Sequence, residues 1–194
     1  RVPAIVRWPG HIPAGTVSNE IMSGLDWFPT LVAAAGEPNI KEKLLQGERA
    51  GDKTFKVHLD GYNFLPHLIG ATEEGPRKEF FYFTDDGDLA ALRYKEWKAV
   101  FLEQPATGYD VWQKPLIELR APYIFSLRRD PFERAYIDAD SFPDWMHHHI
   151  FLLVPAQKYV ADFLKSFKEF PPRQKPASFS LDEALEKLET SSKN

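Results

Sequence analysis

Between residues 79 and 127 the chain passes through four short apolar segments with turn signals between them. The segments are FFYF at 80–83, residues 89–94, residues 97–102 and YIFSL at 123–127. DDGD at 85–88 and the pair Lys95 and Glu96 separate the first three segments, and clusters of this kind mark tight turns. The sequence therefore predicts a four-stranded antiparallel sheet.

A helix is predicted after this sheet, from about Pro155 to Phe170. Its apolar residues recur at helical spacing, and two prolines end it. The stripe consists of Val160, Phe163, Leu164 and Phe167. Four antiparallel strands and one amphipathic helix make a small two-layer unit, to which we assign residues 76–173. Residues 174–194 are expected to be a tail with a short helix, because Ser180 and Glu183 form a capping box.

The first 75 residues have a different character. AIVRW at 4–8 is a mostly apolar run, which favours a strand buried on both faces of a parallel sheet. A helix is predicted next, with Asp26 as N-cap, Pro29 in its first turn and Gly36 at its end. Its apolar face consists of Phe28, Leu31, Val32 and Ala35. One strand cannot make a sheet, so residues 1–75 are expected to be the end of a larger α/β domain whose other strands precede Arg1.

Two connections are predicted. Residues 37–58 are polar and irregular, which indicates a surface connection with room for a short helix. Residues 103–122 are predicted to be a long loop between the third and fourth strands. The fold class is therefore α/β plus α+β: a final strand–helix unit, a small four-stranded antiparallel sheet and a C-terminal helix.

Composition excludes several classes of function. The net charge of −4 provides no basic surface for nucleic acid. No apolar run is long enough to span a bilayer. Cysteine is absent, which excludes disulfides, thiolate metal sites and a cysteine nucleophile in these residues and leaves the compartment open.

The polar clusters offer no convincing active site. Three adjacent histidines at 147–149 point in different directions in any regular element, so a loop surface is predicted rather than a metal site. DDGD at 85–88 lacks the ligand pattern of a calcium loop and fits a hairpin turn. Asp130 before a proline is expected to cap a turn, and Arg134 is expected to neutralise Glu133. We assign no catalytic residue and no metal ligand.

Several segments together resemble the sulfatase family, in particular bacterial arylsulfatases. RVPAIVRWPG at 1–10 is similar to its RVP…WPG segment, and DWFPTL at 26–31 to its D-x-x-P-T-L helix. Residues 59–70 are similar to its DG-x-x-L-x-P-x-L-x-G turn, Arg93 to Lys98 to its R-x-x-x-x-K hairpin, and residues 124–133 to its strand and DP-x-E turn. Each motif is weak alone, but their order and spacing hold over residues 1–135.

The resemblance implies an alkaline-phosphatase-like α/β domain followed by a smaller antiparallel subdomain. It implies sulfuric ester hydrolysis, with an aryl or carbohydrate sulfate as substrate, a formylglycine nucleophile made from Cys or Ser, and calcium. The motifs that supply the nucleophile, the metal ligands and a sulfate-binding Lys are absent here. We therefore expect the C-terminal third of a sulfatase, inactive alone, which binds none of these cofactors and whose partner is the rest of the enzyme. The resemblance also points to a periplasmic or secreted protein.

Within the resemblance, the loop at 103–122 is the candidate rim of the substrate pocket. Tyr109, Asp110 and Trp112 are its candidate substrate-binding residues, since aromatic rims suit aryl and sugar groups. An interface between subdomains explains the same residues equally well.

Two other functions remain open at this point. A phosphodiesterase or phosphonate hydrolase of the same superfamily would share the scaffold, because these motifs report scaffold more than substrate. A non-catalytic structural or interaction module is the second alternative. An apolar strand at 4–8 without neighbours argues against it, because an exposed strand edge promotes aggregation.

Overall fold

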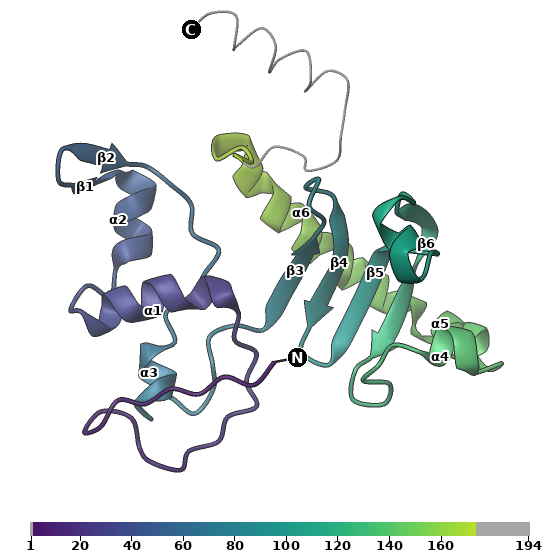
Figure 1. Ribbon diagram of the computed structural model, residues 1–194, viewed down its shortest axis with the longest axis horizontal. Coiled ribbons are helices and arrows are strands. Elements are labelled where there is room, and N and C mark those ends of the chain that lie inside the picture. Colours follow the sequence, from purple (N-terminus) through teal and green to yellow (C-terminus); the bar gives the residue numbers. More distant parts are fainter. Residues whose placement is uncertain (1, 174–194) are drawn as a thin grey trace, which may run out of the picture. The chain divides into compact units, whose positions relative to one another are not determined.

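The computed structural model describes residues 2–173 and divides into two compact units, Arg1–Phe80 and Phe81–Asn194 (Figure 1). Each unit is described by itself. The short tail helix predicted beyond residue 174 lies outside the described residues.

The second unit is built on the predicted four-stranded sheet, in the order β3-β4-β5-β6. The strands are β3 (Glu79–Phe83), β4 (Leu89–Tyr94), β5 (Trp97–Glu103) and β6 (Ile117–Ser126). β5 pairs antiparallel with both β4 and β6. The DDGD turn closes as predicted, because the Thr84 N–H donates to the Asp88 carbonyl oxygen at 2.9 Å. The expected antiparallel architecture is confirmed.

β6 begins at Ile117, so the predicted loop at 103–122 is partly strand. Glu103 pairs with Ile117 and Leu102 with Glu118, and the register shifts between Val100 and Leu102. The residues between the strands include the short 3₁₀ helix η2 (Gly108–Trp112). The apolar and polar residues alternate from 117 to 120, which is a strand signal, but the irregular register at β5 interrupts the pattern.

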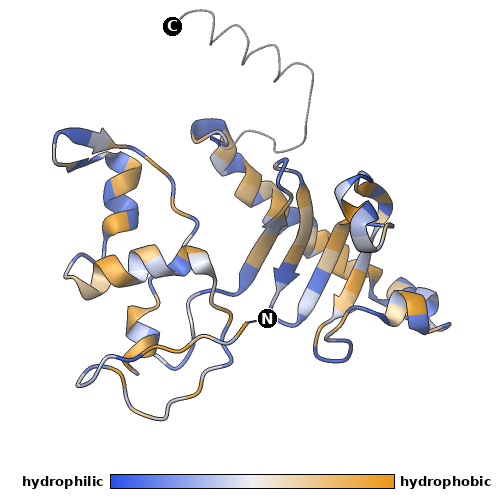
Figure 2. Cartoon of the chain, viewed as in Figure 1, coloured by the Kyte–Doolittle hydropathy of each residue, from blue (hydrophilic) through white to orange (hydrophobic). Residues whose placement is uncertain are grey.

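Helix α6 (Leu153–Glu169) lies across one face of the sheet (Figure 1), close to the predicted bounds. Phe163 stacks on Phe81 of β3 at 4.1 Å between ring centroids, and Phe167 contacts Phe83. Leu164, expected in the same stripe, is 39% exposed. Hydrophobic and hydrophilic residues alternate along α6 in Figure 2, as its amphipathic pattern requires.

Two helices that the sequence analysis missed cover part of the opposite face. They are α4 (Ala135–Asp138) and α5 (Phe142–His149), followed by η3 (Ile150–Leu152). Phe125 of β6 and Phe142 of α5 stack at 5.5 Å and form the core there with Leu127. The histidines at 147–149 therefore lie on a helix rather than on the predicted loop. The overlooked signal was Pro143 in the first turn, where a proline is well tolerated.

The first unit is mostly irregular, and its regular elements are mainly short helices. It contains η1 (Gly24–Asp26), α1 (Trp27–Ala34), α2 (Ile40–Gln46), the hairpin β1 (Glu48–Ala50) and β2 (Lys53–Phe55), and α3 (Leu65–Leu68). The hairpin lies within the stretch predicted as irregular. Gly51 turns it with φ of 62°, a conformation that glycine adopts without strain.

Residues 4–8 form no strand in this structure, and residues 4–7 are exposed. A ladder needs a neighbouring strand, and none of the described segments pairs with them. The predicted apolar face of α1 is also turned outward: Phe28 is 51% and Leu31 is 62% exposed, whereas Thr30 and Ala33 are buried. The helix therefore buries the opposite side from the one that its spacing suggested.

No helix within residues 2–173 combines the length and apolar character needed to cross a membrane.

Candidate functional site

Within residues 2–173 the most buried charged group is Asp26, whose side chain is fully inaccessible to solvent. Its carboxylate accepts two hydrogen bonds from Arg77, from Nε at 2.9 Å and from Nη2 at 2.7 Å. It also accepts from the backbone N–H groups of Ser23 and Tyr62, each at 2.7 Å. Asp26 stands at the predicted N-cap position, but its side chain makes no cap bond to α1. The carboxylate instead joins three segments that are distant in the sequence.

Arg77 is equally well satisfied. Its guanidinium donates to the carbonyl oxygens of Asp60 at 2.8 Å and Glu79 at 3.1 Å, and it lies 4.7 Å from the ring centre of Tyr62. The two buried charges neutralise each other, and each guanidinium nitrogen donates a hydrogen bond, as a structural ion pair requires. The analysis of the sequence missed Arg77, because nothing local identifies a partner 51 residues away.

Tyr62 extends this cluster. Its hydroxyl donates to Glu79 Oε1 at 2.5 Å. Burial raises the pKa of Tyr62 far above its ordinary value of 10.0, and the hydrogen bond to the Glu79 carboxylate acts in the same direction. The phenol is therefore held protonated and serves as a hydrogen-bond donor, rather than as a base.

Gly61 lies where the backbone comes very close to another segment. A Cβ atom at this position would lie 2.1 Å from the Leu25 carbonyl oxygen and 3.1 Å from Pro29 Cγ. Only a residue without a side chain fits beside η1. The glycine of the DG turn therefore allows residues 60–62 to reach Asp26.

Ser18 and His67 form a second polar contact in the first unit, with Oγ and Nε2 2.9 Å apart. The other ring nitrogen, Nδ1, is buried and has no hydrogen-bond partner among the described residues. A serine nucleophile needs a base that a third group orients. The pair lacks that group, so its geometry is not that of a catalytic triad.

In the second unit, Lys98 of β5 binds Glu133, with Nζ 2.8 Å from Oε1 and 2.7 Å from Oε2. The sequence analysis paired Glu133 with Arg134 instead, and that pairing is wrong. Arg134 binds Asp138 one turn along α4. The capping role of Asp130 is confirmed, since its carboxylate accepts from the backbone N–H groups of Arg134 and Ala135.

The structure shows no group of three or more His, Asp or Glu side chains that could hold a metal ion within residues 2–173. His149 is occupied otherwise: its Nδ1–H donates to the Trp145 carbonyl oxygen at 2.7 Å, and its ring stacks on Trp145 at 4.2 Å.

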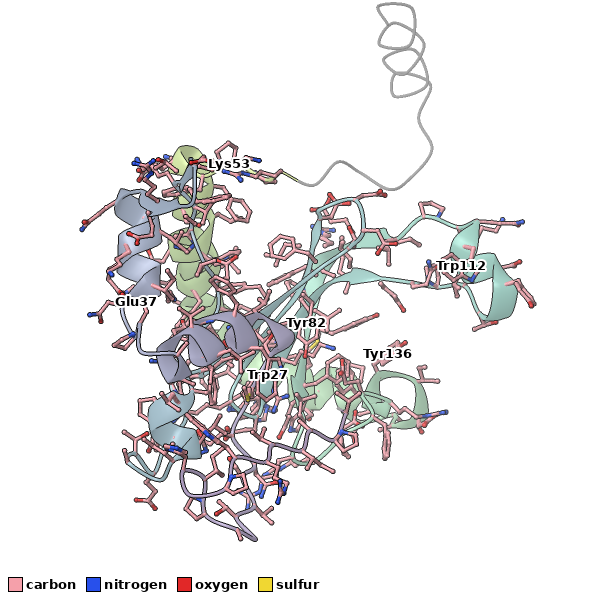
Figure 3. All side chains as sticks on the ribbon, turned by 60° about the vertical axis from the view of Figure 1, so that its left-hand side comes forward. Trp27, Glu37, Lys53, Tyr82, Trp112 and Tyr136 are labelled. Carbon is pink, nitrogen blue, oxygen red and sulfur yellow. The ribbon has the colours of Figure 1, made fainter. Side chains whose placement is uncertain are left out.

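The predicted rim residues lie together on η2. Tyr109 is 89% and Trp112 is 83% exposed. Figure 3 shows Trp112 at the outer end of the projection formed by β5, η2 and β6. Side chains three residues apart share one side of a 3₁₀ helix, so the two rings lie on the same side of η2. Asp110 lies between them in the sequence, and its carbonyl oxygen accepts from the N–H groups of Gln113 and Lys114.

Gln104 fixes this projection. Its side-chain amide donates to the carbonyl oxygens of Val111 at 3.3 Å and Lys114 at 3.1 Å, and its Oε1 accepts from the N–H of Ala106. The two exposed rings are therefore presented from a braced turn, rather than from a free loop.

Comparison with known proteins identifies the family of the chain. A family model described as the C-terminal region of aryl-sulfatase matches residues 75–190. Human arylsulfatase A is 33% identical over 144 residues, which is 69% of this chain and 25% of that protein. Pig N-acetylgalactosamine-6-sulfatase is 33% identical over 152 residues, which is 69% of this chain and 26% of that protein.

The crystal structure of the PsFucS1 sulfatase from Pseudoalteromonas sp. superposes with a TM-score of 0.60 at 20% identity. The superposition covers 84% of this chain and 29% of that chain, and it bears on the fold alone. The present chain spans about a quarter of the length of the curated relatives that it matches. The chain therefore belongs to the sulfatase family, and it corresponds to the family's C-terminal region.

Proposed function

We propose that this chain is the C-terminal part of an enzyme that hydrolyses sulfate esters of aryl or carbohydrate alcohols. The observation that carries the proposal is the family match over residues 75–190, together with relatives named as arylsulfatases. The nucleophile is a formylglycine outside residues 1–194, and calcium is bound outside the described residues. The formylglycine would supply an oxygen nucleophile for the attack on sulfur.

The described residues contribute a scaffold. Asp26 and Arg77 join η1, the DG turn and the entry to β3 into one rigid arrangement. Lys98 and Glu133 do the same for the sheet and the turn after β6. These pairs are internally satisfied, so they position backbone and take no part in proton transfer.

The second contribution is to substrate recognition. Tyr109 and Trp112 present two aromatic surfaces on one side of η2, and Gln104 holds that turn in place. Rings fixed in this way can bind the organic part of a sulfate ester while losing little conformational entropy on binding. Asp110 adds a carboxylate next to the rings, suited to the hydroxyl groups of a sugar.

The test is an assay of the whole protein that contains this chain, with aryl sulfates, phosphodiesters and phosphonates side by side. Hydrolysis of the sulfate with a clear preference in kcat/KM is expected. Residues 1–194 alone should give no turnover. A preference for the phosphodiester or phosphonate would overturn the assignment, and so would metal-dependent sulfate hydrolysis by residues 1–194 of verified mass.

A further inference from the structure

A cavity of about 420 Å³ lies between the sheet and the start of α6. Leu92, Tyr94, Trp97, Ala99 and Ile124 line it from the strands. Leu152, Leu153, Pro155, Ala156 and Tyr159 line it from η3 and α6. All of these elements belong to the second unit. We infer that this cavity is a binding site for a neutral aromatic molecule of about two fused rings.

Large aromatic side chains separate α6 from the sheet, and the lining between them includes two alanines. The Phe81–Phe163 stack at 4.1 Å and the Tyr94–Tyr159 contact at 4.8 Å act as spacers. Ala99 of β5 contributes only a methyl group to the floor, and Ala156 of α6 only a methyl group to the roof.

The lining determines the charge of the ligand. Among the described residues that line the cavity, Lys98 is the one that carries a charge. Alternation along β5 places its side chain on the other face from Ala99, and its ammonium binds Glu133 there. No charged side chain of residues 2–173 therefore enters the cavity, and a charged ligand would lose its hydration without a partner among them.

The lining also determines the shape. Three aromatic side chains, those of Tyr94, Trp97 and Tyr159, form walls that suit a flat ring system. An apolar cavity of about 150 Å³ stays dry and binds benzene. The present cavity is nearly three times larger and falls within the usual range for small-molecule pockets.

The test uses the whole protein and two ligands matched in shape, 2-naphthol and naphthalene-2-sulfonate. The sulfonate carries a fixed charge and has no ester bond to hydrolyse, so neither measurement depends on turnover. Calorimetry should show binding of 2-naphthol with a dissociation constant below about 1 mM. Binding of the sulfonate at this site should be at least about tenfold weaker.

Two variants locate the site. Ala156→Leu fills the cavity and should weaken 2-naphthol binding at least about tenfold. Ala161→Leu makes the same change on an exposed position of α6 and should leave binding within about twofold. Ala99→Val fills the floor instead and replaces Ala156→Leu if that variant does not fold.

Each alternative gives a distinct result. If α6 closes onto the sheet, or another part of the chain fills the space, 2-naphthol does not bind and the inference is wrong. Equal binding by the Ala156→Leu and Ala161→Leu variants places the ligand elsewhere and also overturns it. If the whole protein hydrolysed no sulfate ester in the assay above, these binding results would still hold, so the two proposals can fail separately.

Discussion

Lys98 binds both carboxylate oxygens of Glu133, and this contact joins the β4–β5 hairpin to the turn that follows β6. Lys98 ends the R-x-x-x-x-K motif, and Glu133 ends the DP-x-E motif. The two residues lie 35 positions apart in the sequence. Glu133 adopts φ of 54°, in the left-handed region that residues with a Cβ atom rarely occupy. The ion pair therefore offsets a local backbone strain.

Two substitutions at this position separate strain from charge. Glu133→Ala keeps the strain and removes the carboxylate, and it should lower the free energy of unfolding by about 1–3 kcal/mol. Glu133→Gly removes both, and it should be about 1 kcal/mol more stable than the alanine variant. Denaturant titrations measure the difference. Asp138→Asn, which breaks an exposed pair with Arg134, should change little. Equal stability of the alanine variant and the parent would contradict the prediction.

Asp26→Asn tests the buried pair. The variant keeps the shape of the side chain but leaves the Arg77 guanidinium buried without a counter-charge. It should lower the free energy of unfolding by about 3–5 kcal/mol. Asp162→Asn, at an exposed pair with Lys165, is the matched control and should behave like the parent. A thermal midpoint for Asp26→Asn close to the control would show that the pair contributes little.

Alkaline pH should weaken the fold through Tyr62. Its pKa is raised by burial above 10.0, so above pH 10 the unfolded chain releases this proton first and the free energy of unfolding falls as pH rises. Tyr62→Phe lacks that proton. It should be less stable than the parent at pH 7, and the difference in free energy of unfolding between the two proteins should become smaller above pH 10. Tyr109→Phe, at an exposed tyrosine, should follow the parent throughout. A constant gap would rule out this linkage.

Trp112→Ala tests the role of the projection in the whole enzyme. If the ring contacts the organic part of the substrate, KM should rise more for a bulky sulfate ester than for a small one, with a smaller change in kcat. Phe132→Ala removes an aromatic ring that is also 83% exposed and should leave both constants unaltered. Equal effects of Trp112→Ala on the two esters would identify Trp112 as a packing residue.

Gln104→Ala should reproduce part of the Trp112→Ala effect. It removes the hydrogen bonds that hold η2 but leaves both rings in the sequence. We expect the ratio of KM for the bulky ester to KM for the small ester to rise as in Trp112→Ala, without a lower thermal midpoint. No shift in the ratio would show that the rings do not depend on this brace.

The sheet and α6 could be predicted because their signals are local. Phe163 and Phe167 recur at helical spacing. The DDGD turn marks the first hairpin through its own residues, whatever the rest of the chain does. α1 shows the limit of this reasoning. Its spacing correctly predicted a helix, but Phe28 and Leu31 face outward. Periodicity identifies an apolar side but not what covers it.

The pairings across the chain could not be predicted for a related reason. Asp26 suits an N-cap by type and position, but Arg77 competes for its carboxylate and the burial of both decides the outcome. Glu133 has Arg134 as its neighbour in sequence but Lys98 as its neighbour in space. The proposed rim at Tyr109, Asp110 and Trp112 remains a prediction, now with a defined side of η2.

Gly61 has a consequence for how variants of this protein should be interpreted. Even the methyl group of alanine would displace the Leu25 carbonyl oxygen and, through Tyr62, disturb the binding of Asp26. Such a change lowers the amount of folded protein in a cell rather than the catalytic rate of each folded molecule. A genetic screen for lost activity would therefore rank position 61 with the residues that perform the chemistry. Activity measured per folded molecule would separate the two classes.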